Sequence, residues 1–247
     1  MKYDPDRLID PFSPRKRDLL KRVLSRRRFS RSGRLICSIG YLQAEGDSRN
    51  LVRVLDLFIR NEKDFRKAYE TLLQGYLFCG YPRAIESFFC LSEILKNRKV
   101  SWMNRVKSRS LRDSAELIKR GDSLAGIIHK DKFPRIRNKI SDICPDLGYL
   151  MIAEGYGHVL SRDGLDLKGR ELAVVASLIS LGAYRQLHSH IRGARNIGCH
   201  DLEIYEAIIT GIVWVSPGKI RKAVGLWTDI TGREPPDSID KNIYSRV

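Results

Sequence analysis

Two residues in the second half of the chain, Glu171 and His190, have the types and the setting that acid–base chemistry needs. Glu171 begins a helical stripe in which the third, fourth and seventh residues after it are apolar, so its carboxylate faces the expected core. His190 shares a helix face with the small residues Gly193 and Ala194, which let a neighbouring helix approach. Because a carboxylate beside an imidazole can carry protons near neutral pH, both residues are candidate catalytic groups.

Both residues also have structural interpretations. A glutamate in the first turn of a helix interacts favourably with the exposed N–H groups there, and an inward histidine is often a hydrogen-bonded core residue. A symmetric helix hairpin that turns near residue 183 would displace His190 from Glu171 by about 7 Å along the axis. The spacing therefore leaves contact between them open. His188 lies on a more polar face, so we expect it to face solvent or an entrance.

The elements that must position this pair are helices. Apolar periodicity predicts one helix that ends at Gly182, a second over about 184–196, and a third from about 201 to 212. No stretch alternates with a period of two for long enough to form a convincing strand. The sequence therefore predicts an all-α bundle.

An internal repeat organises the chain. Shifting the sequence by 136 residues aligns residues 35–88 with 171–224 without a gap. The identities include Gly46/Gly182, Tyr69/Tyr205 and Glu70/Glu206. We expect two tandem copies of one helical unit. The first copy has Leu35 and Val54 where the second has Glu171 and His190, so its expected role is structural.

Charge divides the chain further. The net charge is +16, and all of the excess lies in residues 1–34 and 96–139. We therefore predict a basic N-terminal arm (1–34), a first, degenerate repeat (35–95) and a basic connector (96–139) with a helix near 111–120. A second repeat (140–232) that carries the site and a C-terminal tail (233–247) follow. Basic clusters can neutralise phosphates, but neither segment has an aromatic platform or a groove-reading motif. We favour solvated faces or subunit junctions.

Other classes are disfavoured. The longest uncharged apolar stretches, 172–184 and 207–217, are shorter than the roughly 20 residues of a membrane-spanning helix. The first residues carry acids and prolines where a secretory signal needs an apolar segment, so we expect a cytoplasmic protein without membrane contact. The 5 cysteines are scattered and include no C-x-x-C pair, so their spacing indicates neither a disulfide framework nor a metal site.

Longer motifs surround the pair. One is CPDLGYLMIAEGYGHVLSRDGLDLKGRELAVVASLISLG, which ends at Gly182, and another is HSHIRGARNIG, which contains His190. The first half adds an aromatic-x-Gly-x-Pro turn through Phe78, Gly80 and Pro82. In their order and spacing these motifs resemble the carboxymuconolactone decarboxylase family, whose members include the alkylhydroperoxidases.

The resemblance implies an all-α protein that assembles as a trimer or hexamer, with a small-molecule site near His190. Glu171 matches the family's glutamate nineteen residues before the histidine. The alkylhydroperoxidases place a redox cysteine pair seven and four residues before that histidine, where this chain has Ala183 and Gln186. Because the thiolate is the nucleophile in that chemistry, the resemblance excludes peroxide reduction by this route.

We therefore predict a decarboxylase that acts on a small anionic lactone or carbonyl acid without cofactor or metal. His190 is the expected acid/base and Glu171 its partner or a second proton carrier. Charge complementarity makes Arg162 or Arg192 the candidate anion clamp. Two alternatives stay open: a non-catalytic oligomeric protein of this fold, and a protein that binds nucleic acid or an acidic partner through the arm and connector.

Overall fold

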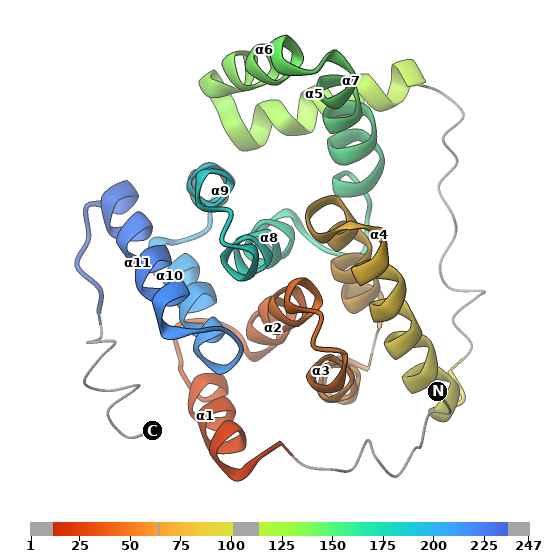
Figure 1. Ribbon diagram of the computed structural model, residues 1–247, viewed down its shortest axis with the longest axis vertical. Helices are drawn as coiled ribbons and strands as arrows, with labels where there is room; N and C mark the ends of the chain where they lie inside the picture. The colour runs from red at the N-terminus through yellow and green to blue at the C-terminus, as the bar shows by residue number, and fades with distance from the viewer. Residues whose placement is uncertain (1–11, 64, 101–113, 237–247) are drawn as a thin grey trace.

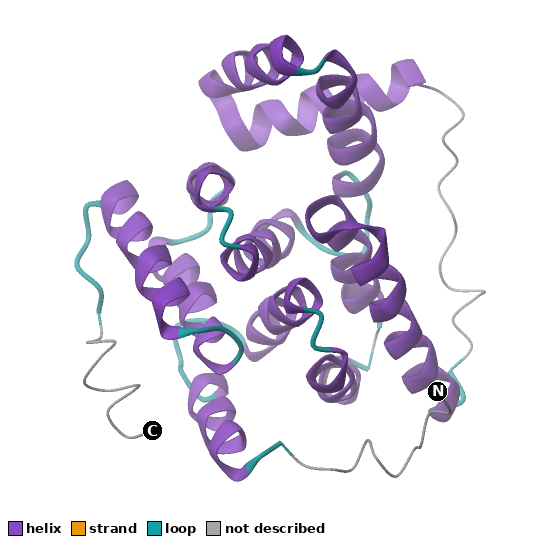
Figure 2. Ribbon diagram, in the orientation of Figure 1, coloured by secondary structure: helices purple, strands orange, loops and turns teal. Residues whose placement is uncertain are grey.

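The computed structural model describes residues 12–63, 65–100 and 114–236, and every regular element in these ranges is helical (Figure 2). This confirms the prediction of an all-α fold. The first half contains α1 (Pro14–Leu24), α2 (Arg31–Glu45), α3 (Ser48–Glu62) and α4 (Arg66–Asn97). The middle contains α5 (Ser114–His129), α6 (Phe133–Ile143), α7 (Pro145–Leu150) and the π-helix η3 (Met151–Leu160). The last part contains α8 (Leu167–Leu181), α9 (Tyr184–Asn196), α10 (Asp201–Thr210) and α11 (Pro217–Thr231).

Short 3₁₀ turns lie at Lys130–Lys132 and Gly211–Val213. Over the described ranges, each helix is too short or too polar to cross a bilayer.

Several helix bounds match at the 136-residue shift, which supports the expected tandem copies in part. Under this shift α2 coincides with α8 at both ends, α3 begins where α9 begins, and α1 matches the last residue of α7 together with η3. The N-caps Ser30 and Asp166 each accept a hydrogen bond from the backbone N–H three residues later. Both helices end at a glycine with positive φ, Gly46 or Gly182. The copies thus share their start signals and stop signals.

The copies diverge at the fourth helix. In the first copy α4 is continuous in outline but kinks at Gly80, where φ is 81° and ψ is 167°. In the second copy the chain breaks at the matching place, so that α10 corresponds to the first half of α4 and α11 to the second half. In Figure 1, α2 and α8 lie side by side at the centre, while α4 and the α10–α11 pair flank them on opposite sides.

The predicted basic arm is only partly separate from this bundle. Leu20 and Val23 of α1 are buried against Val213. Arg26 and Arg34 both form ion pairs with the buried carboxylate of Glu206. The expectation that the basic side chains here are solvated is wrong for these two arginines, because a carboxylate enclosed in the core requires cationic partners.

The predicted connector contains helices. Of the helix expected near 111–120, residues 111–113 lie outside the described ranges, and the rest belongs to α5, which begins at Ser114 and runs to His129. Like α5, the helices α6 and α7 precede Glu171, where the second aligned stretch begins. These helices lie together at the top of Figure 1, and α5 and α7 rest on η3. A Cβ atom on Gly121 would lie 2.1 Å from the carbonyl oxygen of Ile152, and one on Gly157 would lie 2.0 Å from that of Leu117. Glycine at both positions lets the two helices approach this closely.

Candidate active site

The structure brings Glu171 and His190 into contact. The Nδ1 atom of His190 lies 3.0 Å from Oε2 of Glu171, and the two residues are 8% and 1% exposed. A Cβ atom at Gly193 would lie 3.0 Å from the same Oε2 atom, so the carboxylate sits against α9 where the small residue leaves room. A symmetric hairpin would displace the two residues along the helix axis. The side chains of Glu171 and His190 are long enough to meet across this displacement.

Contact with Glu171 orients the imidazole of His190. When Nδ1 carries the proton, it donates to the carboxylate, and Nε2 is left with a free lone pair that can accept a proton. The carboxylate also stabilises the imidazolium that forms when Nε2 takes up a proton. The arrangement suits a general acid/base.

A second hydrogen-bonded pair lies beside the first. The Nε2 atom of His129, at the end of α5, is 2.6 Å from the hydroxyl of Tyr156 on η3. The rings of His129 and His190 meet edge to face with centroids 6.2 Å apart. The second pair is also buried, since each of its residues is 7% exposed. One buried cluster thus combines two imidazoles, a carboxylate and a phenol.

Burial and charge set the protonation of the second pair. Burial, and then the nearby His190, lower the pKa of His129 to about 4, although Glu171 acts in the opposite direction. Burial, followed by the charge of Glu171, raises the pKa of the Tyr156 phenol. At neutral pH His129 is therefore uncharged and Tyr156 keeps its proton.

His129 was not predicted as a site residue, because it lies in the connector, outside both aligned copies. A signal was present: His129 follows Leu124, Ala125 and Ile128 on one buried stripe of α5. Tyr156 was noted only as part of a motif. A polar residue on an apolar helical stripe, the same signal that selected Glu171, would have identified His129.

Two neighbours complete the cluster. The ring of Phe78, just before the kink of α4, packs edge to face on His190 with centroids 5.7 Å apart. The side-chain amide of Asn196 donates to the carbonyl oxygen of Ile128 at 2.8 Å, which ties α9 to the end of α5. The site is therefore built by helices of both copies and by the insertion between them.

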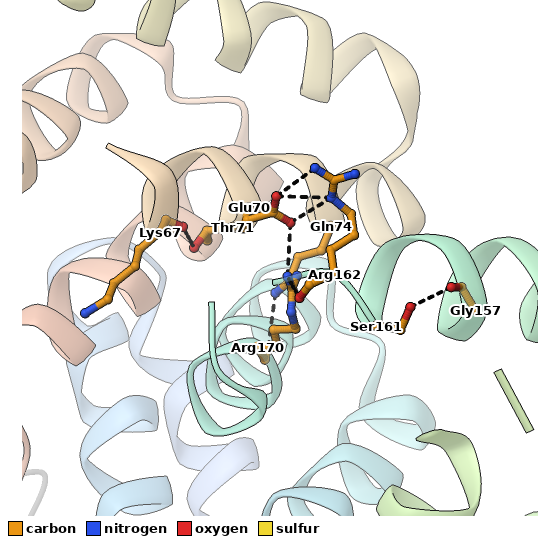
Figure 3. Close-up of polar contacts among 8 residues, drawn as sticks. All are labelled: Lys67, Glu70, Thr71, Gln74, Gly157, Ser161, Arg162 and Arg170. Carbon is orange, nitrogen blue, oxygen red and sulfur yellow. Dashed lines mark hydrogen bonds and ion pairs between the residues drawn. The ribbon is translucent and has the colours of Figure 1, made fainter. Parts of the chain in front are cut away.

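Arg162, one candidate anion clamp, has a different partner. Its guanidinium binds both carboxylate oxygens of Glu70 at 2.9–3.1 Å (Figure 3). Arg170 donates to the same carboxylate at 3.0 Å and to the side chain of Gln74 at 3.2 Å. Because the Arg162 side chain is only 10% exposed and its charge is matched, its observed role is to hold a buried ion cluster rather than to contact His190.

Arg192, the other candidate, is exposed on α9, two residues after His190. It lines a cavity of about 390 Å³ with Arg195, Asn196 and Ile230. A residue two positions along a helix faces a different side, and Arg192 makes no hydrogen bond or ion pair with Glu171 or His190. The structure thus unites the predicted acid/base pair but brings neither arginine to it.

Four of the five cysteines have thiols of raised pKa. Burial raises the pKa of Cys37 and Cys199 to about 12 and that of Cys79 and Cys90 to about 11. These thiols stay protonated at neutral pH and are poor nucleophiles. In the part of the chain that the structure describes, no group of three or more His, Cys, Asp or Glu residues could hold a metal ion.

The part of the chain that carries Glu171 and His190 is similar in sequence to known proteins. The model of the carboxymuconolactone decarboxylase family matches residues 145–229, which include Tyr156, Glu171 and His190. The chain is 35% identical over 101 residues to the nitrosuccinic acid decarboxylase of Metarhizium robertsii, and the match covers 40% of this chain and 67% of that protein. This chain belongs to the carboxymuconolactone decarboxylase family.

A second relative in this comparison is Peroxisomal protein 2 of Saccharomyces cerevisiae. It is 30% identical over 164 residues, which are 58% of this chain and 58% of the yeast protein. The match thus spans little more than half of that relative. Within the carboxymuconolactone decarboxylase match, Glu171 and His190 lie well inside the bounds, whereas His129 lies before them.

Proposed function

We propose that this family member is a cofactor-independent carboxy-lyase for a small anionic lactone or carbonyl acid. His190 is the acid/base and Glu171 orients it. The observation that carries the proposal is the 3.0 Å contact between their side chains inside a buried, partly apolar site. The decarboxylase name of the Metarhizium relative supports the same reaction type and adds nitro acids to the candidate substrates.

The chemistry needs a substrate whose carboxylate is attached to a carbon next to a carbonyl or nitro group. The bond between that carbon and the carboxylate breaks, its electron pair moves into the carbonyl or nitro group, and CO₂ leaves. The carbon then takes a proton from Nε2 of His190 in its imidazolium form, and the neutral ring that results regains a proton from water. Apolar walls such as Phe78 favour loss of a charged carboxylate as neutral CO₂.

A substrate with a second acidic group would also need a positively charged side chain that binds this group. Arg162 is matched by Glu70, so we retain Arg192, whose guanidinium is exposed beside a cavity, as the candidate anchor. An Arg192→Gln variant tests this assignment. Loss of a substrate anchor raises KM, whereas loss of a surface charge alone leaves KM unchanged.

The function is tested by following CO₂ release from a panel of small acids that includes nitrosuccinate and a carboxylated lactone. We expect turnover with the wild-type protein and a decrease in kcat of about 10²–10⁴-fold in His190→Ala. His188→Ala is the matched control, since His188 is exposed on the same helix. No turnover of any panel acid by the wild-type protein would favour the non-catalytic alternative.

The assembly and location of the protein belong to the same proposal. The family resemblance supports a trimer or hexamer, and light scattering that finds a stable 28.4 kDa monomer at micromolar concentration would contradict it. The sequence favours the cytoplasm, whereas the yeast relative is named as a peroxisomal protein. Imaging of a fluorescently tagged chain distinguishes the two compartments.

A further inference from the structure

The residues of the buried cluster differ in polarity from the residues at the matching positions of the first copy. At the 136-residue shift, the first copy has apolar residues where the second has polar ones: Leu20 for Tyr156, Leu35 for Glu171 and Val54 for His190. His129 lies on α5, outside the stretches that the 136-residue shift aligns. The first copy therefore has apolar residues at the three aligned positions. The joint presence of the four polar groups in one cluster indicates a shared function.

The two imidazoles also keep free nitrogens on the same cluster. Each ring uses one nitrogen for its partner, Glu171 or Tyr156. The other two nitrogens are Nε2 of His190 and Nδ1 of His129, and within the described ranges they have no hydrogen-bond partner. Neither atom is among the polar atoms of these ranges that are completely buried without a partner. Both nitrogens therefore border space that a water molecule can reach.

The partner of His129 determines what its free nitrogen can do. A protonated Tyr156 can donate its hydroxyl proton to Nε2 of an uncharged His129. The imidazole proton is then on Nδ1, and this N–H is available as a donor. Burial keeps His129 uncharged at neutral pH, so the ring carries one proton, and acceptance of a hydrogen bond at Nε2 places that proton on Nδ1.

We propose that His129 is a second catalytic residue, which contacts the substrate beside His190 and donates a hydrogen bond from Nδ1 to the oxygen that becomes negatively charged as CO₂ leaves. The inference rests on the proposed function and assigns a role to His129, which lies outside the family match. Tyr156 is a positioning residue, because it selects the tautomer of His129.

In this step His129 neither gains nor loses electrons or a proton. The pair from the broken carbon–carbon bond moves onto the carbonyl or nitro oxygen, where the Nδ1–H of His129 stabilises it. When His190 delivers its proton to carbon, the pair returns to form the new C–H bond. His129 ends each cycle in its starting state, and His190 is reprotonated by water.

The decisive variants are His129→Asn and His129→Gln. An asparagine amide occupies nearly the position of Nδ1 and keeps a donor there, whereas a glutamine amide replaces Nε2. Loss of a single hydrogen bond to a developing oxyanion lowers kcat by about 10²–10³-fold. We expect that loss in His129→Gln, a smaller loss in His129→Asn, and little change of KM in either. Equal kcat for His129→Gln and wild type, with both folded by circular dichroism, would overturn the proposal.

Tyr156→Phe tests the positioning role. We expect about a tenfold decrease in kcat, together with a change in the ¹⁵N signals of His129 that reports a mixture of tautomers. Tyr76→Phe is the matched control, since Tyr76 also donates a phenol proton, to Glu154 at 2.7 Å, but makes no hydrogen bond with His129. Unchanged ¹⁵N signals of His129 in Tyr156→Phe would contradict the assignment of the tautomer.

A binding measurement separates this proposal from the proposed function. Nitrosuccinate is added to wild-type protein with ¹⁵N-labelled histidine, and the ring signals of His129 and His190 are followed. We expect both to shift at the same ligand concentration. A shift of His190 alone would overturn the role of His129 and leave the decarboxylase in place. Shifts of both rings without turnover would support the two-histidine binding site and reject the carboxy-lyase.

Discussion

At the residue scale, Glu171 and His190 should behave as one unit, because the carboxylate has its effect through the ring that it orients. Glu171→Ala is expected to lower kcat by about 10²–10⁴-fold, and the Glu171→Ala/His190→Ala double variant should be little worse than either single change. Turnover and melting temperature are measured together on all three variants. Multiplicative losses in the double variant would show that the two groups act independently.

His129 makes stability depend on pH. Its pKa is about 4 in the folded protein and near 6.5 in an unfolded chain, so protonation favours unfolding between these values. The folded state should therefore lose up to about 3 kcal/mol from this residue as the pH falls from 6.5 to 4. Urea unfolding at a series of pH values measures this loss. His129→Leu should show a flatter profile, and an unchanged profile would contradict the assignment.

At the element scale, the close contact between α5 and η3 fixes the second half of the site. Gly121→Val would place a Cβ atom 2.1 Å from a backbone oxygen of η3, so the helices must separate. We expect destabilisation of about 3 kcal/mol or more and loss of activity, because His129 moves away from Tyr156. Gly126→Ala on the same helix is the control, since no atom lies within 4 Å of its added Cβ. It should keep or raise the melting temperature.

Helix periods and caps predicted the elements that carry Glu171 and His190. The end of the first at Gly182 and the span of the second agree with α8 and α9. The contact between the two residues was not predictable, because it depends on how the two helices cross. The role of α5 was hidden for another reason. It lies within the basic segment 96–139, and only its packing on η3 shows that it belongs to the site.

At the scale of the whole molecule, two ion clusters join the copies reciprocally. Arg26 and Arg34 of the first copy bind Glu206 of the second, and Arg162 and Arg170 of the second bind Glu70 of the first. The paired residues correspond exactly at the 136-residue shift. The repeat was visible in sequence at Glu70 and Glu206, but the exchange of partners between copies was not, because a one-dimensional alignment does not show contacts.

Removal of a carboxylate from one cluster leaves buried guanidinium charge without a partner. We therefore expect Glu206→Gln to destabilise the fold by about 3–5 kcal/mol. Glu116→Gln, which removes an exposed carboxylate paired with Arg120, should cost less than about 1 kcal/mol. Chemical denaturation measures both. A small effect of Glu206→Gln would indicate that water enters the cluster.

Because the two similar halves belong to one chain, matching positions in them can carry different residues. In a symmetric dimer of separate chains, every substitution occurs twice, so a residue that builds an active site in one protomer must be tolerated at the same place in the other. Here Leu35 and Val54 can fill one half of the bundle while Glu171 and His190 occupy the matching positions in the other. When two similar halves stand in one chain, one half can therefore specialise in support while the other carries the candidate site.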